Sequence, residues 1–489
     1  MFRSVYQRRL FVTLLIIAAT APVTIYFGIR AMTTIRTSPS LWVPDTFQKR
    51  REYDWFERTF ETNDSVIISW DGCTLDDRRL ADLHEALSNP DESPDGLLIR
   101  KYVSRVFTGR TLVNAMQDYP LELQESTAKA RLAEALIGPD GETTCCVVLL
   151  SELGGADRKI TVPLLMRVAE EEAGIPPDEQ RLVGPVYDAY SIDIESVKSM
   201  QTFVVPSMFI VTLLCRFCLR SWVYTLLVFI VAVTGETLTL ALVYCGDQLF
   251  DFGPMNAVLI VMPPLEMVFT VSAAVHLVNY YHDEVRRSGT QDAPRKALKN
   301  GLMPCALATG TTAIGLLSLM LSDIIPVKLF GIYATCGIVS TLILLVLTLP
   351  GAQELWPVPA REGRESIFKD LSGISNFVCR YPLLVSLTCL AVMITCGYGL
   401  QFLRTSYSGR SLFTADSQSL NDYQWFEENI GPITPVEVVL HFKSGSDLDE
   451  LERLEVVDQM QQAVSCIEEV QGTMSAATFF QTIPRGFGP

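Results

Sequence analysis

Seven stretches of about 20 apolar residues punctuate the 489-residue chain. Each is long enough to cross the ~30 Å hydrocarbon core of a bilayer as a helix. Because lipid offers no hydrogen bonds to the backbone, such stretches can fold there only with their polar backbone groups paired internally. The sequence therefore predicts a helical membrane protein. The expected spans are residues 10–29, 202–219, 223–244, 254–278, 302–321, 325–349 and 382–403.

Basic residues mark one side of the predicted spans. They precede span one, and they lie between spans two and three, four and five, and six and seven, whereas the alternate loops hold Asp247, Asp251 and Asp323. The positive-inside rule then places the N-terminus in the cytoplasm of a multi-pass protein of the cell inner (plasma) membrane, with its soluble domains periplasmic or extracellular. The first span lacks a convincing cleavage site, so we expect an uncleaved anchor. The basic residues include Arg3, Arg8, Arg9, Arg216, Arg220, Arg286, Arg287, Arg295, Lys296, Lys299, Arg361, Arg364, Lys369 and Arg380.

Acidic residues dominate the first soluble region. The whole chain has a net charge of −16, and residues 38–200 hold 30 acidic and 17 basic side chains. A nucleic-acid partner would need a basic face, so this composition argues against one. A solvated acidic surface explains the charge more simply.

Composition divides the chain into six parts: an anchor at 1–37, an extracytoplasmic α+β domain at 38–200, a five-helix bundle at 201–350, a cytoplasmic linker at 351–381, a seventh span at 382–403, and the start of a second extracytoplasmic domain at 404–489. The linker pattern over 366–379 predicts an amphipathic helix on the membrane face. In the first domain we expect strands at 66–70, 144–150 and 181–183, and helices at 74–87, 112–117, 126–137 and 162–173, with a loop at 88–98. Thr74 and Ser126 are the expected helix caps. This order suggests a ferredoxin-like layer.

A short motif occurs twice. Residues 53–57 read Tyr-Asp-Trp-Phe-Glu and residues 423–427 read Tyr-Gln-Trp-Phe-Glu, an offset of 370. The same offset carries the first apolar span onto the seventh, and a strand-like run follows each copy of the motif. Repeats of this size are common in transporters. We expect one anchor, soluble domain and bundle, followed by a second repeat that is truncated. The sequence is then the N-terminal part of a longer protein, or a half that requires a homo-oligomer.

Further motifs resemble a known family. They are Val-His-Leu-Val-Asn-Tyr-Tyr at 275–281, Thr-Gly-Thr-Thr-Ala-Ile-Gly at 309–315, Pro326 with Phe330-Gly331, and Pro350. Together with the repeat, the chain resembles the resistance–nodulation–division (RND) superfamily, and especially its MMPL-type transporters with a sterol-sensing-like bundle. The resemblance implies proton-driven export of hydrophobic or lipid-like molecules, with membrane lipids as neighbours. Two alternatives stay open: a non-transporting sterol-sensing-like protein that binds lipid and regulates, and an inactive truncated half-transporter.

Small residues and prolines in the predicted spans suggest sites of close packing or bending. Gly310, Gly315 and Gly331 would let helices approach closely. Pro263 and Pro264 would break hydrogen bonds within span four and mark a hinge or a bend.

Membrane-embedded carboxylates are the candidate energy-coupling groups. The resembled family typically carries an Asp-Tyr pair in span four, but those positions hold Ser272 and Ala273 here. Glu236 and Glu266 lie instead in spans three and four, which are antiparallel neighbours. A buried carboxylate is costly when ionised and tends to mark an ion or substrate path, and two of them can share one proton. We predict a proton relay of Glu236 and Glu266, with His276 as a possible third member; packing or a wet crevice is the alternative.

The cysteines and motifs of the soluble regions give no support to an ATPase or a hydrolase. In an oxidising compartment Cys73 could pair with Cys145 or Cys146. The soluble regions carry no nucleophile motif, phosphate-binding loop or metal-ligand spacing. We therefore expect no enzyme activity, no metal and no cofactor.

Overall fold

The computed structural model describes residues 4–36, 39–44, 46–60, 64–358, 371–403, 417–432, 436–443, 445, 448–467 and 470–480. It separates into two compact units. One is the membrane unit, residues 1–36 and 196–411, and the other is the soluble unit, residues 37–195 and 412–489.

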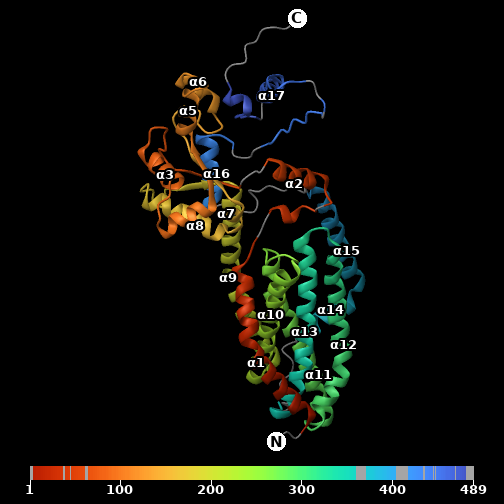
Figure 1. Cartoon of the computed structure of the whole chain (residues 1–489). Coiled ribbons are helices and arrows are strands. Elements are labelled where there is room, and N and C mark those ends of the chain that lie inside the picture. The colour runs from red at the N-terminus through yellow and green to blue at the C-terminus, as the bar shows by residue number, and fades with distance from the viewer. Residues whose placement is uncertain are drawn as a thin grey trace. The chain divides into compact units, whose positions relative to one another are not determined.

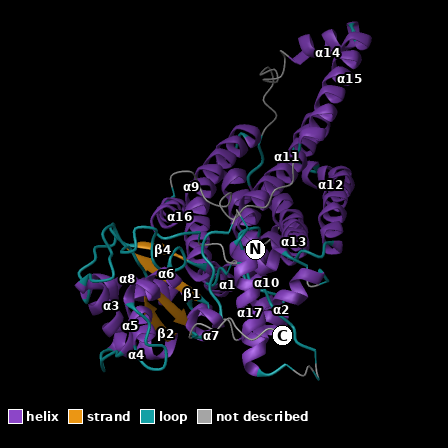
Figure 2. Ribbon diagram, turned by 90° about the horizontal axis from the view of Figure 1, so that it is seen from above, coloured by secondary structure: helices purple, strands orange, loops and turns teal. Residues whose placement is uncertain are grey.

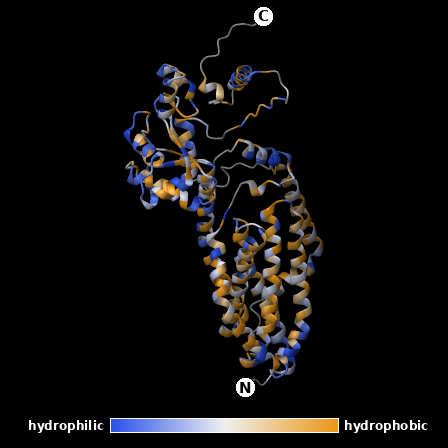
Figure 3. Cartoon of the chain, in the orientation of Figure 1, coloured by the Kyte–Doolittle hydropathy of each residue, from blue (hydrophilic) through white to orange (hydrophobic). Residues whose placement is uncertain are grey.

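Seven helices of the described residues are long and apolar enough to cross a membrane. Six of them form the anchor and the bundle, and the colouring in Figure 3 shows many hydrophobic residues along these helices. In the membrane unit, α1, α10, α11, α12 and α13 lie side by side (Figure 1). The spans are in α1 (Val5–Thr33), α9 (Pro185–Leu219), α10 (Trp222–Phe250), α11 (Met262–Ser288), α12 (Ala293–Leu317), α13 (Ile325–Leu355) and α15 (Pro382–Gly399).

Apolar side chains of α1, α9, α10, α11, α12 and α13 form the centre of the bundle. Leu10 of α1, Val228 of α10 and Leu345 of α13 are at most 1% exposed and belong to one cluster. Gly351 brings α13 against α1, because a Cβ there would overlap Tyr6 O. The anchor is thus an integral part of the bundle, whereas α15 has no buried residue.

The fourth span begins later than the sequence predicts. Residues 254–258 are not α-helical, and a single 3₁₀ turn (Leu259–Val261) leads into α11. Pro263 and Pro264 consequently lie at the start of the helix, where a missing N–H breaks no helical bond. The prediction that these prolines break hydrogen bonds within the span is wrong, whereas a hinge at this point stays a prediction. Pro206, by contrast, lies inside α9.

The first soluble domain is built on a four-stranded antiparallel sheet, shown in Figure 2. Its strands are β1 (Ser65–Ser69), β2 (Val103–Thr108), β3 (Cys146–Leu150) and β4 (Arg181–Val183), in the spatial order β2-β3-β1-β4. Val66 of β1 pairs with Val148 of β3, and Ile68 of β1 pairs with Leu182 of β4. With helices between β1 and β2 and between β3 and β4, this order is that of the predicted ferredoxin-like layer.

Helices cover the sheet, and several bounds differ from the prediction. The segment expected as a loop at 88–98 contains α4 (Pro94–Tyr102), capped by Ser93, and β2 after it is missing from the prediction. Asp77, and not Thr74, is the N-cap of α3. Ser126 lies inside α6 and does not cap its N-terminus, and the helix ends at Leu132. Thr74 instead forms a β-bridge to Thr143. The remaining helices here are α2 (Gln48–Phe60), α3 (Arg78–Ser88), α5 (Gly109–Gln117), α6 (Glu125–Leu132), α7 (Glu152–Ala156) and α8 (Arg158–Glu171).

Residues after the seventh span contribute two helices to the soluble unit, α16 (Gln418–Asn429) and α17 (Glu450–Ser465). Phe426 and Ile430 join the core of the first soluble domain. The strand-like residues 436–441 form neither a helix nor a strand ladder within the described part of the chain. Of the predicted amphipathic linker helix, the structure describes α14 (Leu371–Arg380), and residues 366–370 lie outside the described residues.

Candidate functional site

Two glutamates lie together inside the bundle. Glu236 occupies the middle of α10 and is 7% exposed, and Glu266 lies one turn into α11 and is fully buried. Gly235, the residue before Glu236, lies beside the Glu266 carboxyl. The structure thus brings together two residues that the sequence places in different spans.

The backbone before α11 sets the position of Glu266. The Asn256 side chain, 2% exposed, accepts hydrogen bonds from the backbone N–H of Val258 (3.1 Å) and of Leu259 (3.3 Å). The Met255 carbonyl accepts from the backbone N–H of Arg36 at 2.9 Å. Irregular backbone is tolerated at such a place because protein, and not lipid, surrounds it. The capped turn then starts α11 four residues before Glu266.

Glycines on two neighbouring helices make room for the Glu266 carboxyl. A Cβ on Gly337 of α13 would overlap the Glu266 carboxyl carbon and both of its oxygens. A Cβ on Gly235 of α10 would lie 3.8 Å from Glu266 Oε2 and would overlap Thr341 Cγ2. These contacts make the carboxyl part of the packing between α10, α11 and α13. A change in its charge or hydration therefore acts on three helices at once.

The carboxyl groups lack the partners that a buried charge needs. Within the described residues, neither Glu266 oxygen has a hydrogen-bond partner, nor has Glu236 Oε1, and neither glutamate forms an ion pair. The nearby Thr239 and Thr270 hydroxyls donate to the carbonyls of Gly235 (3.0 Å) and Glu266 (2.7 Å). A buried carboxylate without a partner is costly. The pair is therefore suited to hold a proton and to release it when the site hydrates.

The other predicted relay residue is not part of this cluster. His276 lies ten residues after Glu266 on α11, about 15 Å along the helix axis. Its side chain is exposed on the surface of the bundle, and so is that of Ser272, whereas Ala273 is half-buried. The structure therefore does not bring His276 together with the two glutamates, and its part in a relay stays a prediction.

The small residues that shape the site are mostly not those the sequence suggested. A Cβ on Gly310 or Gly315 would meet nothing within 4 Å, so the close packing predicted there is not found. A Cβ on Gly331 would lie 2.5 Å from Leu316 O, so α12 and α13 do approach closely at that point. Sequence reasoning did not single out Gly235 and Gly337, the two glycines beside the glutamates. The signal for one of them was available, since Gly235 directly precedes a glutamate within an apolar span.

The predicted disulfide does not form in the structure. Cys73, Cys145 and Cys146 are buried free thiols of the first soluble domain. Burial raises the pKa of Cys73 to about 12 and raises the pKa of Cys145 and of Cys146 as well. The thiolate is the reactive form, so these thiols are inert at neutral pH.

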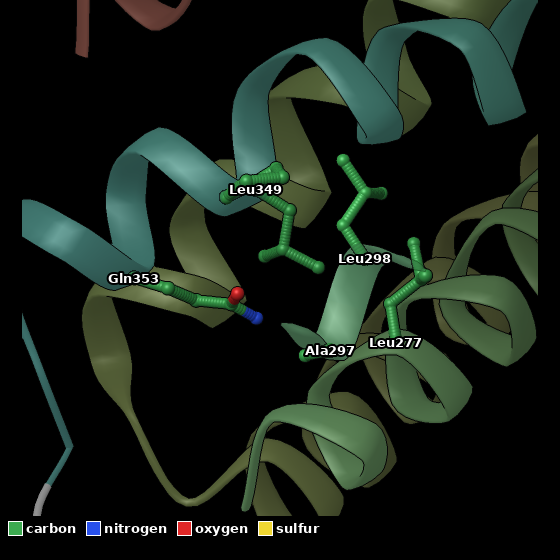
Figure 4. A pocket seen from close by; sticks show the side chains of 6 residues that line it. Leu277, Ala297, Leu298, Leu349 and Gln353 are labelled. Atoms are coloured by element: carbon green, nitrogen blue, oxygen red, sulfur yellow. The ribbon is translucent and has the colours of Figure 1, made fainter. Parts of the chain in front are cut away.

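The bundle also contains a hollow between α11, α12 and α13 (Figure 4). It encloses about 10 Å³, roughly the space of one water molecule. Its walls are apolar except for the Gln353 side chain. The hollow is too small for a lipid-like molecule.

Comparison with protein families supports the resemblance seen in the sequence. The model of the MMPL family matches residues 89–374, which is more than half of the chain and includes both glutamates. A comparison with curated proteins finds no match. With seven apolar helices in the described residues, a polar site inside the bundle and this match, the chain belongs to the MMPL family and is a multi-pass membrane transporter of the RND type.

Proposed function

We propose that this transporter exports hydrophobic or lipid-like molecules across the inner membrane, and that protonation of Glu236 and Glu266 drives the cycle. The observation that carries the proposal is the buried carboxyl pair without hydrogen-bond partners at Glu266. In an energised membrane such a pair can take a proton from the outer side and release it to the cytoplasm. The orientation proposed from the basic loops, with the N-terminus inside, gives this flux its direction.

Helix packing supplies the link between protonation and movement. In the structure α13 packs closely against the Glu266 carboxyl at Gly337, and we assign this close packing to the neutral carboxyl. When the carboxyl ionises, it needs water or a cation, and the tight contact with Gly337 leaves no space for either. Deprotonation therefore favours separation of α13 from α11. We propose that this alternation between close and open packing is the conformational step of transport.

A second candidate function rests on one observation. The family position for a relay aspartate holds Ser272, which is exposed on the bundle surface. If the glutamates serve packing alone, the bundle is a sterol-sensing-like lipid-binding module with a regulatory role. The two functions differ in one measurable property, because only the transporter moves its cargo at the expense of a proton gradient.

Efflux of the hydrophobic dye Nile red from energised whole cells tests the proposal. We expect Glu266→Gln and Glu236→Gln to reduce proton-gradient-dependent transport at least tenfold, because glutamine cannot carry the proton. Glu284→Gln is the matched control: Glu284 lies on the same helix, is 8% exposed, and its carboxylate accepts a hydrogen bond from Asn300 at 3.0 Å. If Glu236→Gln and Glu266→Gln both retained the wild-type rate of efflux, the relay would be refuted. Efflux that a protonophore does not change would favour the lipid-binding alternative.

A further inference from the structure

Helix α16 shows how the repeated aromatic motif is used. Asp422, immediately before the motif, is fully buried; its carboxylate accepts from Arg181 at 3.1 Å and from the backbone N–H of Leu182 at 3.3 Å. Both partners belong to β4 of the first soluble domain. A helix that follows the seventh span is thus fastened to a sheet that precedes the second span.

The aromatic residues of the motif complete this contact. Trp425 donates from Nε1 to Asp71 Oδ1 at 2.5 Å, and Tyr423 donates to the Asp188 carboxylate. Phe426 and Ile430 are 1% and 4% exposed and lie in the core of the first domain. The motif therefore works as a docking face in which aromatic rings fill the core and polar groups fix the orientation.

Helix α2 carries the same motif but leaves it uncovered. The offset of 370 relates Trp425 to Trp55, Phe426 to Phe56 and Ile430 to Phe60. Trp55 is 45% exposed and Phe60 is 52% exposed, and Phe56 is only half-buried. Trp55 and Phe56 both contact Phe60, with ring centroids 6.1 and 4.9 Å apart. On α16 the corresponding Phe426 and Ile430 are buried and Trp425 is half-buried. Helix α2 therefore presents an aromatic face of the same design, but more exposed to solvent.

The repeat identifies the surface that matches this face. In the first domain the docking position is already filled by α16. Shifted by 370, β1 falls on residues 435–439, and α3 falls on 448–458, where α17 lies. The same shift carries Asp71, the partner of Trp425, onto His441. Residues 436–443 form no ladder within the described residues, and most of them are exposed, so their surface is also open.

Charge agrees with this pairing. Acidic α16 meets Arg181 on the first domain. Residues 436–480 hold nine acidic and two basic side chains, whereas α2 holds four basic and three acidic ones. The basic end of α2 around Lys49 and Arg51 is therefore suited to the acidic second segment, with the charges exchanged relative to the α16 contact.

We propose that the aromatic face of α2 (Trp55, Phe56 and Phe60) docks on the second soluble segment, residues 436–443 and 448–465, with Trp55 reaching His441. Each soluble domain then receives a helix from the other repeat: α16 from the second repeat enters the first domain, and α2 from the first repeat enters the second. The two domains become mutually fastened and move as a coupled pair. This goes beyond transport as such, because it assigns a partner surface within the chain.

Cross-linking of cysteine pairs in the full membrane-embedded chain tests the pairing. The background is Cys466→Ser, since the other cysteines of the described soluble unit are buried. The test pair is Trp55→Cys with His441→Cys, treated with a short bifunctional maleimide. Trp425→Cys with Asp71→Cys is the positive control because those two side chains are in contact, and Trp55→Cys with Asp71→Cys is the negative control.

We expect the test pair to cross-link within one chain at a yield within about twofold of the positive control, and well above the negative control. A cross-link that joins two chains would overturn the proposal in favour of a second copy as the partner. In a separate variant, Phe60→Cys should react with a soluble maleimide at least tenfold more slowly than Arg58→Cys, because Arg58 is exposed and lies about 160° around α2 from Phe60. Equal labelling of the two positions would mean that the aromatic face is uncovered, and it would overturn the proposal even if Trp55→Cys disturbed the local fold.

Discussion

At the scale of single residues, the account depends on glycines that let helices close on a carboxyl group. Gly337 has no substitute there, since any Cβ would overlap Glu266. Gly310 resembles it in the sequence, as a glycine inside an apolar span, but a Cβ at that position would meet open space. The difference lies in the neighbours and not in the glycine, which is why the sequence alone directed attention to the wrong positions.

Gly337→Ala should destabilise the bundle and slow transport. Forcing a methyl group into a filled site typically costs about 1–3 kcal/mol. Gly310→Ala, the matched control, should be neutral or stabilising by up to ~1 kcal/mol, because alanine is the better helix former. Thermal unfolding of the two purified variants checks this. An equal unfolding temperature for both variants would contradict the packing described around Glu266.

Asp422 should give the α16 contact a measurable pH dependence. Burial raises the pKa of Asp422 to about 6, against the opposing effects of the Arg181 guanidinium and the Leu182 N–H. The folded state then holds the proton more tightly than the unfolded state, whose carboxyl has the ordinary pKa of 3.8. Stability contributed by this group is therefore highest at low pH and falls as the pH rises from about 4 to about 6.

The comparison of wild type with Asp422→Asn isolates this effect from other carboxyl groups. Hydrogen exchange of the α16 amides gives the free energy needed to open this helix. We expect the difference in this free energy between wild type and the variant to fall across that pH window, by no more than about 3 kcal/mol. A difference that grows with pH would mean that the Arg181 ion pair dominates over burial.

At the scale of elements, the start of α11 decides where the candidate site lies. Asn256 caps the turn before the helix, and the two prolines occupy helical positions that need no N–H. Asn256→Ala should cost about 1 kcal/mol, as for other lost caps, and should lower the transport rate by displacing Glu266. Pro263→Ala should leave transport within about twofold of wild type. If Pro263→Ala abolished transport, the hinge suggested by the sequence would be supported.

The elements also show what the sequence could and could not predict. Spans were predictable because length and hydropathy suffice, and β1, β3 and β4 because apolar and β-branched residues follow one another. Strand β2 was not, since its edge position leaves Ser104 and Arg105 exposed and weakens the apolar pattern. The pairing of Glu236 with Glu266 followed from antiparallel neighbours. The position of His276 away from the two glutamates could not be predicted, because the sequence shows the residues of a span but not the side of the helix that faces the bundle.

At the scale of the whole molecule, the proposed orientation can be tested with native thiols. Cys466 lies after the second soluble helix, Cys379 lies in the helix before the seventh span, and both are exposed. A membrane-impermeant maleimide added to intact cells should label Cys466 and leave Cys379 unlabelled until the membrane is permeabilised. If Cys379 were labelled before the membrane is permeabilised, the topology would be the reverse of the proposed one. The direction of the proposed proton flux would then be reversed as well.

The central claim is that Glu236 and Glu266 carry an exchangeable proton inside the bundle. Infrared spectroscopy of the protein in lipid at neutral pH measures this directly, through the carbonyl band of a protonated carboxyl group. The account predicts such a band in the wild type, shifted in heavy water and lost in the double variant Glu236→Gln with Glu266→Gln, while Glu284→Gln retains it. A wild-type spectrum without the band, or one that the double variant leaves unchanged, would contradict the account.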